Sequence, residues 1–275
     1  MKGSGISHGA LTVVNALPSG CGAALGVDLQ VKVDAEVETT GRGYRALPDT
    51  ALFREIIYGI GRSASFENLK ALFTVYSDLP SRAGMKSSSS VANAAILAVS
   101  NALKLELSVA DVLRLNVEAS RRAGVTFTGA LDDAAACLIG GVQVSNNLDD
   151  KILRSYFSEA EAAIFLLPDG VTRPDNLLSK TNTLKELSRT AFRLALDGRY
   201  HEAINLNGSM CASALGYDYQ PIIEAWRGGA TACGLTGNGP AYSLLTTEDK
   251  KEYLATKWEK YGRVIMCNSR LQEAE

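Results

Sequence analysis

The most constraining feature of the sequence is a strict alternation of apolar and polar residues from Val27 to Glu38. Every second residue from Val27 to Val37 is apolar, and each residue between them is polar or charged. Side chains of a strand point alternately to the two faces of its sheet, so this alternation requires one face in a core and the other in water. The segment therefore predicts a long, half-buried strand of an antiparallel or mixed sheet.

A second segment, Ser88–Leu103, is apolar nearly all round, and a helix without a polar face is a buried one. The other elements follow from periodicity and from helix start and stop signals, with Asp49 as a candidate N-cap and Ser108 to Asp111 resembling a capping box. Further strands are expected at His8–Leu17, Leu69–Tyr76, Val142–Ser145, Ala163–Leu167, Ala241–Thr246 and Arg263–Cys267. Further helices are expected at 49–60, Ser108–Arg122, Asp132–Ile139, Asn176–Leu196, His201–Leu215 and Tyr219–Arg227, with a last one after Thr247.

The order and spacing of the predicted strands and helices change near residues 146–160. We predict an α+β protein of two domains, with residues 1–150 as a nucleotide- and phosphate-binding domain and residues 151–275 as a second domain. The second domain is expected to combine βα-repeats with an antiparallel sheet. A chain of 275 residues is long enough for two domains of modest size.

Charge and cysteine content narrow the class of protein. The net charge of −2 argues against a general binder of nucleic acid or of membrane surfaces. The five cysteines lie too far apart for a metal-finger spacing, which indicates reduced thiols in a cytosol. No signal segment is visible, and no apolar run approaches the ~18 residues of a membrane span. A cytoplasmic protein is expected.

A glycine- and serine-rich loop precedes the apolar helix. Its residues are Pro80, Ser81, Arg82, Ala83, Gly84, Met85, Lys86, Ser87, Ser88, Ser89 and Ser90. Alone, such a stretch is most often a polar loop with a serine at the helix start. Between a strand and a buried helix, however, it combines close backbone approach at glycine with hydroxyl and helix N–H groups that bind phosphate oxygens. The P-loop pattern would need glycine at residues 80 and 85, so a phosphate site of another construction is expected.

A pair of carboxylates, Asp132 and Asp133, opens the next short apolar helix, which ends at Gly140-Gly141. Simple helix capping would also explain acidic residues there. Because the helix behind them is too apolar for the surface, the pair indicates a carboxylate that orients or deprotonates a hydroxyl nucleophile and faces a metal.

A third glycine-rich turn contains Gly237 and Gly239 and lies just before a strand. Its backbone amides are candidates for closing a site over an anion. Four arginines are candidates for pairing with a substrate carboxylate, and the sequence does not choose among Arg62, Arg121, Arg122 and Arg173.

Together the three motifs resemble those of the GHMP kinase superfamily. Its P-x-x-x-G-L-x-S-S-[AS] pattern is matched from Pro80 to Ser89, with Met85 in place of Leu. Its acidic motif is similar to residues 128–140, and its G-x-G-P motif matches Gly237 to Pro240. Within the superfamily, residues 9–16, 22–29, 86–94 and 128–135 look like the archaeal-type shikimate kinases.

The resemblance implies the two-domain GHMP kinase fold, with a ribosomal protein S5 domain 2-like N-terminal domain and a ferredoxin-like C-terminal domain. It implies ATP and Mg²⁺, and transfer of the γ-phosphoryl group to the 3-hydroxyl of shikimate in chorismate and aromatic amino-acid biosynthesis. The loop from Pro80 to Ser90 would lie over the nucleotide phosphates, and Ser88 would ligate Mg²⁺.

The acidic position has two possible registers. Counting forward from Gly129 selects Asp132, whereas counting back from Gly140 selects Asp133, which we favour because a helix leaves less room for insertions. Where related sequences carry a lysine after Pro18-Ser19-Gly20, this chain has Cys21.

Two alternatives to a shikimate kinase stay open at this point. One is another GHMP kinase, acting on homoserine or an isoprenoid alcohol, because short motifs do not report the acceptor pocket. The other is a catalytically silent binding protein of the same fold, which would be expected to lose the acidic pair or the serines.

Overall fold

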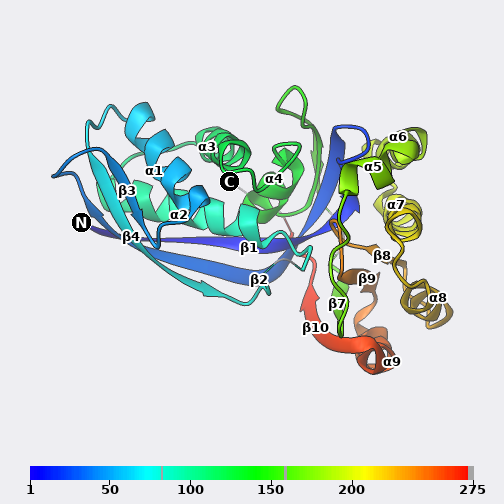
Figure 1. The fold of residues 1–275 in the computed structure, drawn as a ribbon. Coiled ribbons are helices and arrows are strands. Elements are labelled where there is room, and N and C mark those ends of the chain that lie inside the picture. The colour runs from blue at the N-terminus through cyan, green and yellow to red at the C-terminus, as the bar shows by residue number, and fades with distance from the viewer. Residues whose placement is uncertain (82, 158–159, 272–275) are drawn as a thin grey trace.

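The computed structural model describes residues 1–81, 83–157 and 160–271 of the chain. They form two β-sheets, each with helices packed against it (Figure 1). The strands are β1 (Lys2–Val14), β2 (Cys21–Glu38), β3 (Tyr44–Leu47), β4 (Leu69–Ser77), β5 (Val142–Asn146), β6 (Lys151–Tyr156), β7 (Ala162–Pro168), β8 (Ala232–Leu235), β9 (Tyr242–Thr246) and β10 (Gly262–Asn268). The helices are α1 (Ala51–Ser63), α2 (Ser87–Leu103), α3 (Val109–Arg122), α4 (Leu131–Ile139), α5 (Leu177–Thr181), α6 (Lys185–Leu196), α7 (Tyr200–Leu215), α8 (Gln220–Arg227) and α9 (Lys251–Trp258).

The larger sheet is built around the long strand β2. One part of β2 pairs with β4 and the other with β5, while β1 runs antiparallel along most of its length. The strand order is β3-β4-β2-β5-β6, and helices α1 to α4 lie on one face (Figure 1). Val31 and Val33 are fully buried in that face, whereas Glu36 and Glu38 are exposed. The predicted alternation in β2 is therefore confirmed, and the parallel pair β3 and β4 makes the sheet mixed.

Helix α2 is the internal helix of this half, as its composition predicted. Ala94, Ala95 and Ile96 have no exposed surface. The helix approaches β1 at Gly5, where a Cβ atom would lie 2.2 Å from the carbonyl oxygen of Ala94. Glycine in β1 therefore allows the helix backbone to rest directly on the strand.

The smaller sheet has the order β10-β7-β9-β8 and is antiparallel throughout, as expected. The chain changes sheets between Tyr156, where β6 ends, and Ala162, where β7 begins. Strand β6 pairs with β5 of the larger sheet, so residues 151–156 extend the first sheet, while the division into domains 1–150 and 151–275 stays a prediction. Helices α6 and α7 of the second half contact β1, which joins the two halves.

Several elements differ from the sequence-based expectation. The short strands β3, β6 and β8 were not expected, and β1 and β2 both begin earlier than their apolar patterns. The single helix predicted from Asn176 to Leu196 is wrong, because a 3-10 turn at Asn182–Leu184 separates α5 from α6. The buried hydroxyl of Thr181 donates to the carbonyl of Leu177, a local bond that competes with a regular helix.

The starts of α1 and α3 follow the expected capping chemistry, but the cap of α1 is Thr50 and not Asp49. Ser108 and Asp111 form the predicted reciprocal cap of α3. Helix α1 is capped by Thr50, whose hydroxyl accepts from the N–H of Phe53. No helix in the described ranges is long and apolar enough to cross a membrane.

Candidate active site

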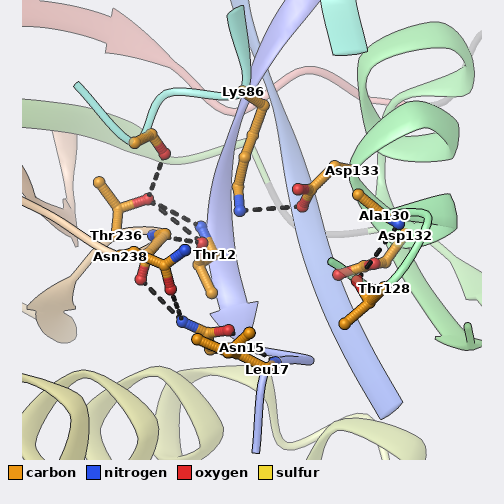
Figure 2. A network of polar contacts seen from close by, with 12 residues as sticks. Thr12, Asn15, Leu17, Lys86, Thr128, Ala130, Asp132, Asp133, Thr236 and Asn238 are labelled. Atoms are coloured by element: carbon orange, nitrogen blue, oxygen red, sulfur yellow. Dashed lines mark hydrogen bonds and ion pairs between the residues drawn. The ribbon is translucent and has the colours of Figure 1, made fainter. Parts of the chain in front are cut away.

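A cavity of about 410 Å³ opens where the two halves of the chain meet. Its walls come from the start of α2, the start of α4, the end of β1 and the turn at 237–238. All three motifs identified in the sequence therefore reach one cavity. Figure 2 shows their side chains facing one another across it.

Helix α2 begins at the cavity without a side-chain cap. Its N-cap residue, Lys86, has a left-handed backbone conformation with φ of 63°, and the described residues supply no side-chain hydrogen bond to the first turn. Ser87, Ser88 and Ser89 line the cavity at this end. The free N–H groups and the positive end of the helix are therefore available to an anion.

Helix α4 begins at the same cavity in the same way. Its N-cap, Ala130, also has a left-handed conformation, with φ of 52°, and receives no side-chain cap from the described part of the chain. Asp132 and Asp133 stand in its first turn. Two helix N-termini thus converge, and the second carries the acidic pair.

Lys86 and Asp133 form an ion pair across the cavity wall. The Nζ atom of Lys86 lies 2.9 Å from Oδ1 of Asp133, and both side chains are largely buried (Figure 2). The pair connects the start of α2 to the start of α4 and fixes the orientation of both side chains. Removing one partner would leave a poorly solvated charge, so the two residues are expected to act as a unit.

Asp132 points to a different environment. Its Oδ1 atom accepts a hydrogen bond of 2.8 Å from Nδ2 of Asn147, and a Cβ atom at Gly22 would lie 2.5 Å from its Oδ2. Burial, and then the negative charge of Asp133, raise the pKa of Asp132 to about 7, while Lys86 and the bond from Asn147 oppose the shift. Asp132 therefore anchors α4 against β2 and the turn after β5.

Three segments that are distant in sequence meet on the opposite side of the cavity. The hydroxyl of Thr236 donates to the carbonyl of Gly84 at 3.2 Å and accepts from the N–H of Thr12 at 3.1 Å. The N–H of Gly237 donates to the hydroxyl of Thr12 at 2.7 Å. Gly84 has φ of 88°, and a Cβ atom there would lie 2.3 Å from the carbonyl oxygen of Thr236. Only glycine permits this junction.

Several other predicted site residues do not line the cavity in the described part of the chain. Ser81 is exposed, and Arg82 lies outside the described residues. Ala83, Met85 and Ser90 are buried behind the loop, with the hydroxyl of Ser90 making no hydrogen bond to the described residues. Pro80, Gly239 and Cys21, like these, do not line the cavity in the described part of the chain.

The structure adds residues that the motifs did not single out. Asn15 donates to the carbonyl of Gly237 and to Oδ1 of Asn238, both at 2.9 Å, and lines the cavity with Asn238. Phe127, on the loop before α4, is 66% exposed and also lines it. The signal available for Phe127 in the sequence was an aromatic residue in the short segment between Gly124 and Gly129. Asn15 carried no chemical signal outside the resemblance.

The donors at the cavity are hard oxygens. Among the described residues no group of three or more His, Cys, Asp or Glu side chains is gathered to hold a metal. The hydroxyl-bearing Ser88, exposed at the start of α2, and the carboxylate of Asp133 line the same space. Such a set suits Mg²⁺, which usually binds through one or two protein oxygens together with substrate phosphates.

Comparison with known proteins agrees with this geometry. Residues 51–141 match the family model of the GHMP kinases N-terminal domain. The crystal structure of the Methanococcus jannaschii mevalonate kinase has a TM-score of 0.74 at 13% identity, covering 98% of this chain and 98% of that chain. The two-domain GHMP kinase fold implied by the motifs is therefore confirmed.

Full-length relatives narrow the family further. The shikimate kinase of Pyrococcus abyssi is 34% identical over 280 residues, covering 98% of this chain and 100% of that protein. The shikimate kinase of Thermococcus kodakarensis is 35% identical over 270 residues, covering 95% and 97%. The chain belongs to the GHMP kinase superfamily and, within it, to the archaeal-type shikimate kinases.

The raised pKa of Asp132 predicts a pH-dependent gain of stability for Asp132→Asn. In the wild type, charging this buried carboxyl lowers the free energy of unfolding. This loss is absent below the unfolded-state pKa of about 3.9 and grows with pH until about 7. The amide keeps an acceptor for Asn147 without the charge. In urea unfolding, the free energy of unfolding of the variant should therefore exceed that of the wild type by more at pH 8 than at pH 5. An equal difference in unfolding free energy at both pH values would contradict the buried-carboxyl assignment.

Proposed function

We propose that this protein transfers the γ-phosphoryl group of ATP to the 3-hydroxyl of shikimate, giving shikimate 3-phosphate and ADP. The chain is an ATP-dependent small-molecule kinase, and its relationship to shikimate kinases over its whole length carries the choice of acceptor. The product belongs to chorismate and aromatic amino-acid biosynthesis. The paired Lys86 and Asp133 beside an uncapped, serine-rich helix start support the chemistry.

The nucleotide phosphates are proposed to bind at the start of α2. Ser87 to Ser89 offer hydroxyls and backbone N–H groups to the cavity, and the helix end supplies a partial positive charge. The rest of the loop from Pro80 to Ser90 would follow the phosphates, and Gly237 would close the site from the second half.

Mg²⁺ is proposed to be held by the hydroxyl of Ser88 together with phosphate oxygens. When bound, it neutralises charge on the β- and γ-phosphate oxygens. The position of Ser88 in the first turn of α2, exposed at the cavity, supports this role.

Asp133 is proposed to receive the proton of the acceptor. As the 3-oxygen of shikimate forms its bond to the γ-phosphorus, the proton of that hydroxyl passes to the carboxylate of Asp133. The bond from the γ-phosphorus to the bridging oxygen breaks, and the electron pair leaves with ADP. Both carboxylates line the cavity, and Asp133 is favoured because it faces Lys86, whereas Asp132 accepts a hydrogen bond from Asn147.

A coupled ADP-release assay with shikimate, homoserine and mevalonate tests the proposed acceptor. We expect turnover with shikimate that is lost when EDTA removes divalent cations. If homoserine or mevalonate supports turnover and shikimate does not, the proposed function is wrong.

The role of Asp133 is tested by comparing two variants of the acidic pair. Asp133→Asn should lower kcat with shikimate by at least about 10²-fold, because general-base contributions are of this order. Asp132→Asn is the matched control and should have a smaller effect on kcat. If only Asp132→Asn lowered kcat, the assignment of the acidic motif to Asp133 would be wrong by one residue.

A further inference from the structure

Two asparagines are completely buried in the apolar interior behind the cavity. Asn93 lies on α2 and Asn116 on α3, and neither residue has exposed surface. Burying an amide costs free energy unless its donors and acceptors are paired. Because a leucine of similar volume would avoid that cost, the two amides indicate a need for directional contacts at this place.

Asn116 connects α3 to the start of α2. Its Nδ2 atom donates to the carbonyl of Ser89 at 2.9 Å and to Oδ1 of Asn93 at 2.7 Å. Its Oδ1 atom accepts from the hydroxyl of Ser120 at 3.0 Å. Ser89 and Ser120 both line the cavity. Asn116 therefore holds two residues of the cavity wall from behind.

Asn93 continues this connection to α4. Its Nδ2 atom donates to the carbonyl of Ala134 at 2.9 Å and to the hydroxyl of Ser7 at 3.4 Å. The Ser7 hydroxyl in turn donates to the carbonyl of Cys137 at 3.0 Å. Ala134 directly follows Asp133 in the chain. The two asparagines thus form a continuous hydrogen-bonded link from the first turn of α2 to the beginning of α4.

The backbone carbonyls fix the orientation of both amides. A carbonyl oxygen can only accept, so the atom that faces Ser89, and the atom that faces Ala134, must be an amide nitrogen. A buried network with its members paired in this way holds one arrangement of the helices. Apolar packing alone is non-directional, whereas a hydrogen bond weakens steeply when its length or angle changes.

The proposed reaction needs such a fixed arrangement. The phosphates are assigned to the start of α2, whereas Asp133 comes from α4, so the reacting groups belong to two different helices. A misplacement of about 1 Å between reacting groups can lower a rate about 10²-fold.

We propose that Asn93 and Asn116 are positioning residues for phosphoryl transfer. They fix the start of α2 relative to the start of α4, and thereby the phosphate site relative to Asp133. They act through the backbone carbonyls of Ser89 and Ala134 and not on the substrates. This inference rests on the proposed function, because it takes the start of α2 as the phosphate site and Asp133 as the proton acceptor.

Steady-state kinetics of Asn116→Leu test the positioning role. The substitution keeps the approximate volume but removes the donors to Ser89 and Asn93. We expect kcat with shikimate to fall at least about tenfold, because the reacting groups lose their alignment. KM for ATP should stay nearly unchanged, since the N–H groups at the start of α2 remain. Asn93→Leu should behave in the same way, and the double variant should lose little more than either single variant, because neighbouring residues of one network are not additive.

Gln143→Leu is the matched control for loss of a buried amide. Gln143 of β5 is also completely buried, and its Nε2 atom donates to the carbonyl of Gly140 and to the hydroxyl of Ser155, both at 2.8 Å. This variant should lower the free energy of unfolding, as Asn116→Leu does, but leave kcat of the folded enzyme nearly unchanged.

Wild-type kcat in Asn116→Leu would overturn the inference, and so would an equal loss of kcat in Gln143→Leu. If Asn116→Leu does not fold, Asn116→Gln decides the question. Its longer side chain keeps the amide but displaces it in a packed interior, so kcat should again fall, and wild-type kcat would overturn the inference. If the wild type turned over only a different acceptor, the proposed function would be wrong, and kcat with that acceptor would decide the role of the two asparagines.

Discussion

The contact between Gly84 and Thr236 is the constraint on which the site depends. It brings the loop before α2 against the turn of the second half, and the hydroxyl of Thr236 ties both to Thr12 at the end of β1. Because a Cβ atom at Gly84 would lie 2.3 Å from a backbone oxygen, a larger residue would force the two halves apart. Such a displacement would widen the cavity between the two halves. It would also increase the distance between a phosphate at α2 and an acceptor on the other wall.

The two uncapped helix starts explain how a protein of net charge −2 can attract anionic substrates. Helices α2 and α4 both begin from a left-handed residue and both direct free N–H groups to one cavity. Each helix start therefore contributes a positive partial charge to the cavity, although the net charge of the chain is slightly negative. The ion pair of Lys86 and Asp133 lies between these starts and places a carboxylate next to the expected phosphate position.

Much of the fold could be predicted because its signals are local. The alternation in β2, the apolar surface of α2 and the reciprocal cap at Ser108 each depend on neighbouring residues. Strands β3, β6 and β8 were missed because they are short and are defined by pairing with distant strands. Strand β6 lies at the sheet edge and is mostly exposed, so it lacks an apolar pattern.

The candidate site shows the same limit. Motif spacing located the loop before α2, the acidic pair and the last glycine-rich turn, since each is a contiguous segment. Spacing could not reveal that Lys86 pairs with Asp133, or that Arg173 rather than Arg121 reaches the cavity, because those contacts arise only when the two halves meet. The separate partners of Asp132 and Asp133, which are Asn147 and Lys86, likewise become visible only in the fold.

The central claim is that shikimate and ATP meet in the cavity between the two halves. The most direct measurement is a crystal structure with shikimate, Mg²⁺ and a non-hydrolysable ATP analogue. We expect the γ-phosphate at the start of α2, Mg²⁺ against the hydroxyl of Ser88, and the 3-hydroxyl of shikimate in hydrogen-bond contact with Asp133. Shikimate bound outside this cavity, or with its 3-hydroxyl turned away from Asp133, would contradict it.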